Sequence, residues 1–280
     1  MRVKAAVAAV AAVLSLAACA PDQAKPTGRP VVVASSWAVG ELARAIGGRE
    51  IDVVDLLPAG VEPHDAELSP RQVDLLEDAD LILHLGSRLQ PAVAEVAGRQ
   101  ADGQAVDLLG GRTGDPHVWL DPLLWSEVAH RVGAQLAAIG ADGAPARATG
   151  YRAGLTRIND RFRTGLAECD RRVFVTPHDA FGHLARRYRL VEESVTGIDP
   201  EAEPDPRRVA DLVDLARTAG VTTVFHEPGV PDGPTRPVAG ELDATLAPLD
   251  PLEVGAPGTY ESRMGADLAA LTSALGCRTP

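Results

Sequence analysis

The stretch 30–56, PVVVASSWAVGELARAIGGREIDVVDL, decides the fold class of this chain. It opens on a β-branched run at 30–35 and closes on a second such run at 51–56. Between them, Leu42 and Ile46 repeat at the spacing of one helix face. Runs rich in Val and Ile favour buried strands. The stretch therefore predicts a strand–helix–strand unit, the building block of parallel α/β proteins.

The same alternation continues along the chain and predicts six further strands, at 81–85, 105–109, 173–176, 191–195, 221–225 and 244–249. Helices are expected between them and at 262–275. Ser69-Pro70 and Asp121-Pro122 each supply an N-cap residue and a first-turn proline, so we expect a helix to begin at each pair.

The alternation stops at 144–168, where no strand pattern is present. Leu155, Ile158 and Phe162 follow spacings of three and four residues and form one stripe of a long helix. We interpret it as a rigid connecting helix between two α/β lobes of similar size, at 30–143 and 169–280.

The first nineteen residues have the pattern of an export signal. A basic start and an apolar run end in Leu16-Ala17-Ala18-Cys19, which is typical of a bacterial lipobox, whose cysteine is acylated. The alternative is a plain secretory signal with an incidental cysteine. Either interpretation predicts an extracytoplasmic protein, lipid-anchored to the cell membrane through Cys19 or periplasmic. Residues 20–29 are polar with Pro and Gly, as in a flexible tether.

The net charge limits the classes of function that fit this chain. The net charge of −12 argues against nucleic-acid binding and is compatible with collecting cations.

Cys169 and Cys277 are either a disulfide pair, as expected for two cysteines in an exported protein, or metal ligands. We favour the disulfide because Cys277 lies in the C-terminal tail, far along the chain from any histidine cluster.

Three histidines share one setting, since each follows a proline directly. His64 lies in a loop after a predicted strand, His117 lies just before a predicted helix, and His178 lies at the end of a predicted strand. Parallel sheets bind ligands at loops beyond the carboxyl ends of their strands. Three imidazoles leave room for a fourth ligand on tetrahedral zinc, and Asp250 is the predicted one, at another strand end beside a proline. Such a set would accept manganese or iron less selectively.

Glu227 also stands at a predicted strand end, in FHEP at 225–228. We interpret it as an outer acceptor that hydrogen-bonds a ligand, in preference to the adjacent His226.

The chain resembles the solute-binding proteins of zinc and manganese ABC importers, and the resemblance covers 31–277. Six segments carry it, in the order in which they follow along the chain. They are EPHD at 62–65 with LSP at 68–70, DPHVWLDP at 115–122, HDAFG at 178–182, EAEP at 201–204, FHEP at 225–228 and LDPL at 249–252.

The resemblance implies two lobes joined by a long rigid helix, with the metal in the cleft between them. Its ligands fall on His64, His117, His178 and Asp250, and a histidine in the third position implies zinc rather than manganese. Cys169 and Cys277 also resemble a cysteine pair that is found in some relatives, which supports the disulfide. The chain lacks a His-rich loop before His117, so no accessory collecting role is expected.

The predicted function is therefore capture of Zn²⁺ as cargo, with Mn²⁺ or Fe²⁺ as alternatives, by a monomer that delivers it to an ABC permease. We expect no enzymatic activity. The main alternative is an exported zinc hydrolase. A catalytic zinc needs an open coordination position and a general base, and Glu227 is the candidate base if Asp250 does not bind. A surface adhesin is the second rival.

Overall fold

The computed structural model describes residues 28–64, 66–112, 114–229 and 232–278. The predicted signal peptide at 1–19, the predicted lipidation site Cys19 and nearly all of the predicted tether at 20–29 lie outside this part. Within it, no helix combines the length and apolarity needed to cross a membrane.

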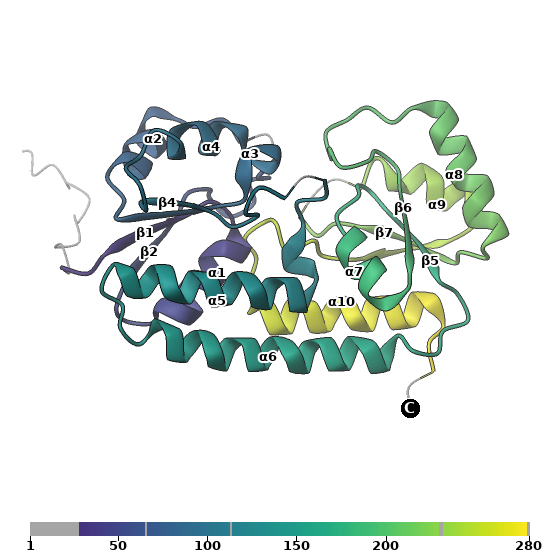
Figure 1. The fold of residues 1–280 in the computed structure, drawn as a ribbon. Coiled ribbons are helices and arrows are strands. Elements are labelled where there is room, and N and C mark those ends of the chain that lie inside the picture. The colour runs from purple at the N-terminus through teal and green to yellow at the C-terminus, as the bar shows by residue number, and fades with distance from the viewer. Residues whose placement is uncertain (1–27, 65, 113, 230–231, 279–280) are drawn as a thin grey trace, which may run out of the picture.

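Two four-stranded parallel sheets form the two lobes (Figure 1). The first has the order β2-β1-β3-β4 and the second the order β6-β5-β7-β8, so both lobes repeat one topology. The strands of the first sheet are β1 (Val31–Ala34), β2 (Asp52–Asp55), β3 (Leu81–His84) and β4 (Ala105–Asp107). Those of the second are β5 (Val173–Thr176), β6 (Val191–Ser194), β7 (Thr223–His226) and β8 (Thr245–Pro248). All eight predicted strands are present.

Helices cover the sheets and connect their strands. In the first lobe they are α1 (Trp37–Gly47), α2 (Pro70–Glu77), α3 (Gly86–Leu89), α4 (Pro91–Ala97), the 3₁₀ turn η1 (Val118–Leu120) and α5 (Pro122–Ala138). In the second lobe they are α7 (Gly182–Tyr188), α8 (Pro206–Thr218), α9 (Thr235–Leu242) and α10 (Tyr260–Leu275).

Two predicted helix starts are found at their cap-and-proline pairs. Asp121 accepts hydrogen bonds from the backbone N–H groups of Leu123 and Leu124, and Pro122 occupies the first turn of α5. Ser69 forms a capping box with Gln72 ahead of α2. Each cap satisfies N–H groups that have no partner within the helix, which is why the helices begin at these residues.

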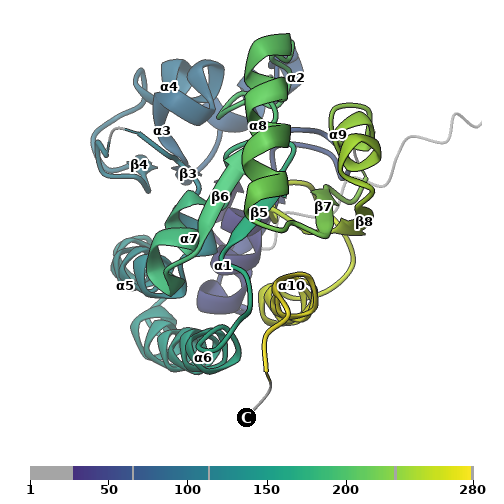
Figure 2. The same ribbon diagram turned by 90° about the vertical axis from the view of Figure 1, so that its right-hand side faces the viewer.

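The long helix α6 (Ala144–Gly165) runs beneath both lobes (Figure 1). Its buried stripe contains the predicted Leu155, Ile158 and Phe162. The final helix α10 lies beside α6, as the end-on view in Figure 2 also shows. The lobes are therefore supported by two helices rather than by one.

The predicted disulfide between Cys169 and Cys277 is present. It ties the chain just after α6 to the chain just after α10.

Candidate metal centre

Four side chains converge between the lobes, at the carboxyl ends of the strands. His64 follows β2 and His117 follows β4, so the first lobe supplies two of them. His178 follows β5 and Glu253 follows β8, so the second lobe supplies the other two. Their ligand atoms all lie within 4.8 Å of one another.

The spacing of these atoms suits a tetrahedral ion. The Nε2 atoms of His64 and His117 are 3.3 Å apart, and Nε2 of His64 is 3.2 Å from Oε1 of Glu253. Bonds of about 2.0–2.1 Å to zinc place tetrahedral ligands about 3.3 Å from one another. Oε1 of Glu253 lies 2.8 Å from Nε2 of His117, and Oε2 lies 3.6 Å from Nε2 of His178.

Outer carboxylates orient two of the imidazoles. Asp115 Oδ1 lies 2.8 Å from Nδ1 of His117 and also accepts the His117 backbone N–H. Glu227 Oε1 lies 2.6 Å from Nδ1 of His178. Acceptors at Nδ1 keep the proton there and turn Nε2 toward the shared centre, as is usual for metal-ligating histidines. Glu227 thus contacts a member of the convergent group without belonging to the group of four.

Two buried ligand atoms have no hydrogen-bond partner within the described residues, Nε2 of His178 and Oε2 of Glu253. Buried polar atoms without partners are rare because they lose their hydration without compensation. A cation at the centre of the group would satisfy both.

The imidazoles and carboxylates of the group shift one another's pKa values. Burial opposes protonation of both His117 and His178, but nearby carboxylates, Glu253 above all, raise the pKa of His117 to about 9 and that of His178 to about 11. Burial would raise the pKa of Glu253, yet the two histidines hold that pKa well below its usual range. Beside the group, burial and the carboxylates of Glu253 and Glu227 raise the pKa of Glu62 to about 8.

The expectation that Asp250 supplies the fourth ligand is corrected by this structure. Both carboxylate oxygens of Asp250 bind the Arg263 guanidinium, at 2.6 and 2.7 Å, and Asp250 does not belong to the convergent group. Glu253, three residues further along the same loop, takes the position instead. The signal that could have found it is a second carboxylate in the loop after the last predicted strand.

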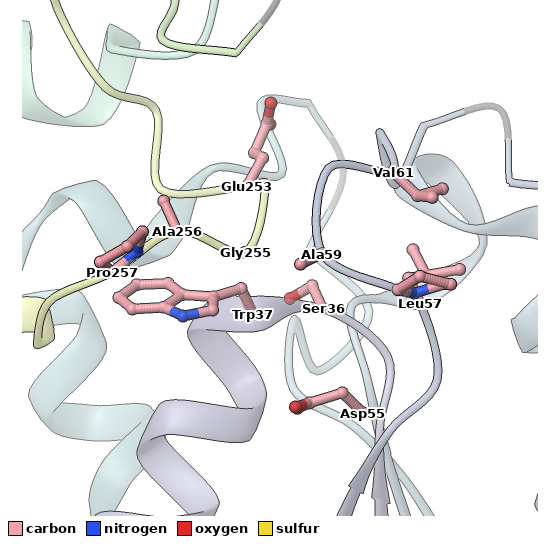
Figure 3. Close-up of a pocket in the computed structure, with 11 residues that line it drawn as sticks. Ser36, Trp37, Asp55, Leu57, Ala59, Val61, Glu253, Gly255, Ala256 and Pro257 are labelled. Carbon is pink, nitrogen blue, oxygen red and sulfur yellow. The ribbon is translucent and has the colours of Figure 1, made fainter.

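Glu253 lies over a cavity of about 320 Å³ at the seam of the lobes. Figure 3 shows its carboxylate directed away from Trp37, which lines the cavity from the start of α1. The cavity therefore lies behind the loop that carries Glu253, on the side opposite the histidines.

The other histidines have different surroundings. His226 ends β7 and is absent from the convergent group. His183, on α7, lies 3.0 Å from the Asp115 carbonyl oxygen through Nε2. His84 is buried in β3, and burial lowers its pKa. His130 is exposed on α5.

Two α/β lobes on a helical support, with one metal-ligating group drawn equally from both, define the class of metal-binding solute-binding proteins. The family model for the periplasmic component A of the zinc-uptake complex, ZnuA, matches residues 32–274, and the chain belongs to this family.

Relatives agree with this assignment. The zinc-binding protein AdcA of Streptococcus pyogenes serotype M1 is 26% identical over 264 residues, which cover 81% of this chain and 51% of AdcA. The chain thus spans about half the length of that relative. The high-affinity zinc uptake system protein ZnuA of Bacillus subtilis strain 168 is 27% identical over 249 residues, 79% of this chain and 78% of that protein.

A solved structure shows the same fold. The periplasmic zinc binding protein TroA from Treponema pallidum superimposes with a TM-score of 0.82 at 23% identity, over 89% of this chain and 99% of that one.

Proposed function

We propose that this chain captures one Zn²⁺ ion outside the cytoplasm and delivers it to the permease of an ABC importer. The observation that carries the proposal is the convergence of three imidazoles and the Glu253 carboxylate from the two lobes at tetrahedral spacing. Three nitrogen ligands favour zinc over manganese, which prefers oxygen. Zinc uptake by the relatives supports the same cargo.

The geometry favours capture over hydrolysis. A catalytic zinc keeps an open coordination position, whereas His64, His117, His178 and Glu253 supply four protein ligands. Glu227, the candidate base of the hydrolase alternative, is engaged with Nδ1 of His178. In our proposal the chain acts as a monomer, and acylated Cys19 holds it at the membrane.

Metal content and competition titration test the proposal on the chain that begins after Cys19. We expect one zinc per chain, resistant to excess manganese and lost in His117→Ala. His130→Ala is the matched control, because His130 is exposed on α5 and should leave zinc binding unchanged. Absence of zinc from the wild-type chain, or unchanged binding in His117→Ala, would refute the assignment. Preference for manganese or iron would keep capture and change the cargo.

A further inference from the structure

A second group of potential ligands lies against the three histidines. Carboxylate oxygens of Glu62, Glu227 and Glu253 lie within 4.8 Å of one another, and Glu253 belongs to both groups. Glu227 and Glu253 are buried, whereas Glu62 is partly exposed. The centre therefore has an imidazole side and a carboxylate side, and Glu62 is the most accessible carboxylate of the three.

Glu253, the carboxylate that the two groups share, also has an oxygen without a partner among the described residues. Its Oε2 atom is buried and has no hydrogen-bond partner among the described residues, although Oε1 lies close to two imidazoles. A buried carboxylate oxygen without a donor is unfavourable unless a cation satisfies it.

Glu62 is held beside the first ligand of the imidazole side. The backbone N–H of His64 donates to Oε1 of Glu62 at 3.4 Å, only two residues along the chain. An ion bound at Glu62 and Glu253 would therefore lie next to His64 while it still retains part of its hydration. Carboxylates bind partly hydrated divalent cations readily, whereas four-coordinate zinc must lose its water.

We propose that Glu62 is the entry carboxylate, which receives the incoming zinc ion together with Glu253 and passes it to the three histidines. This inference rests on the proposed zinc capture. Glu62 lies outside the group of four that completes a tetrahedral site, so it acts on the passage of the ion and not on the ion once held. A residue that stabilises only the passage changes uptake and release by the same factor and leaves the dissociation constant unchanged.

Stopped-flow kinetics of Glu62→Gln test the proposal on the chain that begins after Cys19. Zinc uptake is followed by competition with a fluorescent chelator, and release is extrapolated to the limit independent of chelator concentration. We expect both rates to fall about tenfold, at the lower end of electrostatic effects on association, with the dissociation constant within about threefold of wild type.

Glu67→Gln is the matched control, because it makes the same substitution at an exposed position in the same loop. It should leave both rates near wild type. Thermal melting and a stoichiometry of one zinc per chain establish that Glu62→Gln is folded with its four ligands intact.

Three results would overturn the proposal: unchanged rates in Glu62→Gln, equal slowing in Glu67→Gln, or faster release alone. The last would make Glu62 a ligand of the held ion. Each differs from failure of the proposed function, in which the wild-type chain itself binds no zinc.

Discussion

Asp250 and Glu253 lie three residues apart in one loop and have different partners. Asp250 binds Arg263 through both oxygens and accepts the backbone N–H of Leu252, which has a left-handed φ of 58°. The Arg263 guanidinium also lies 4.0 Å from the centre of the Trp37 ring. Asp250 therefore fixes the shape of the loop, and that shape directs Glu253 toward the histidines.

We predict opposite phenotypes for Glu253→Gln and Asp250→Asn. Glu253→Gln should weaken zinc binding more than about 100-fold, because a lost ligand exceeds the 10–100-fold effect of outer partners. Asp250→Asn should keep one zinc per chain but lower the free energy of unfolding by about 3 kcal/mol, because Arg263 would be left buried without its partner. Zinc titration and urea unfolding of the metal-free variants measure the two effects. A greater loss of zinc affinity in Asp250→Asn would contradict this division of roles.

Zinc binding should release protons. The pKa of His117 is raised to about 9 and that of His178 to about 11, so both imidazoles are protonated in the metal-free protein at pH 7.5. Coordination needs neutral imidazole, so about two protons leave per ion at pH 7.5, and affinity rises with pH steeply up to about 9 and less steeply from there to about 11. Calorimetry in buffers of different ionisation enthalpy counts these protons. A heat of binding independent of the buffer would contradict the prediction.

At the scale of elements, strands were predictable and the fourth ligand was not. Each strand has a β-branched run closed by a turn, so local sequence sets its position, as at β5, where predicted and observed bounds agree. The loop after β8 offers two carboxylates, and no local rule distinguishes them. Arg263, on α10, makes the distinction by binding Asp250 across thirteen residues, a tertiary contact that no periodicity encodes. The histidines were accessible to prediction because each directly follows a proline in a segment beyond a predicted strand.

The start of α5 also joins the two lobes, and this predicts its sensitivity to mutation. Asp121 caps α5 and also binds Arg187 of α7, at 2.8 Å. Asp205 caps α8 from an exposed position. Asp121→Ala should lower the free energy of unfolding by about 2–3 kcal/mol, since it removes a cap and a largely buried charge partner. Asp205→Ala removes only a cap and should lower the free energy of unfolding by about 1 kcal/mol. Urea unfolding of both metal-free variants measures the difference, and equal losses would show that the contact with Arg187 contributes nothing.

At the scale of the whole molecule, the ligands and the disulfide lie at opposite ends of the second sheet. His178 follows the carboxyl end of β5, whereas Cys169 precedes its amino end. The disulfide closes 108 residues of chain, from the end of α6 to the end of α10, and so encloses the whole second lobe. It restricts the unfolded chain without touching the metal centre.

Removal of the disulfide should therefore lower the free energy of unfolding and leave the zinc affinity of the folded protein nearly unchanged. In the chain-entropy model, a closed loop of about 100 residues stabilises a protein by up to about 4.7 kcal/mol. We expect the double variant Cys169→Ser, Cys277→Ser to unfold at clearly lower urea concentration. At 25 °C its zinc dissociation constant should stay within about threefold of wild type, because all four ligands and both outer carboxylates keep their supports. Urea unfolding of the metal-free protein and zinc competition below the transition measure the two quantities. A large loss of zinc affinity in the folded double variant would contradict this prediction. It would show that the disulfide between the ends of α6 and α10 sets how the lobes approach each other, and that the metal centre depends on that approach.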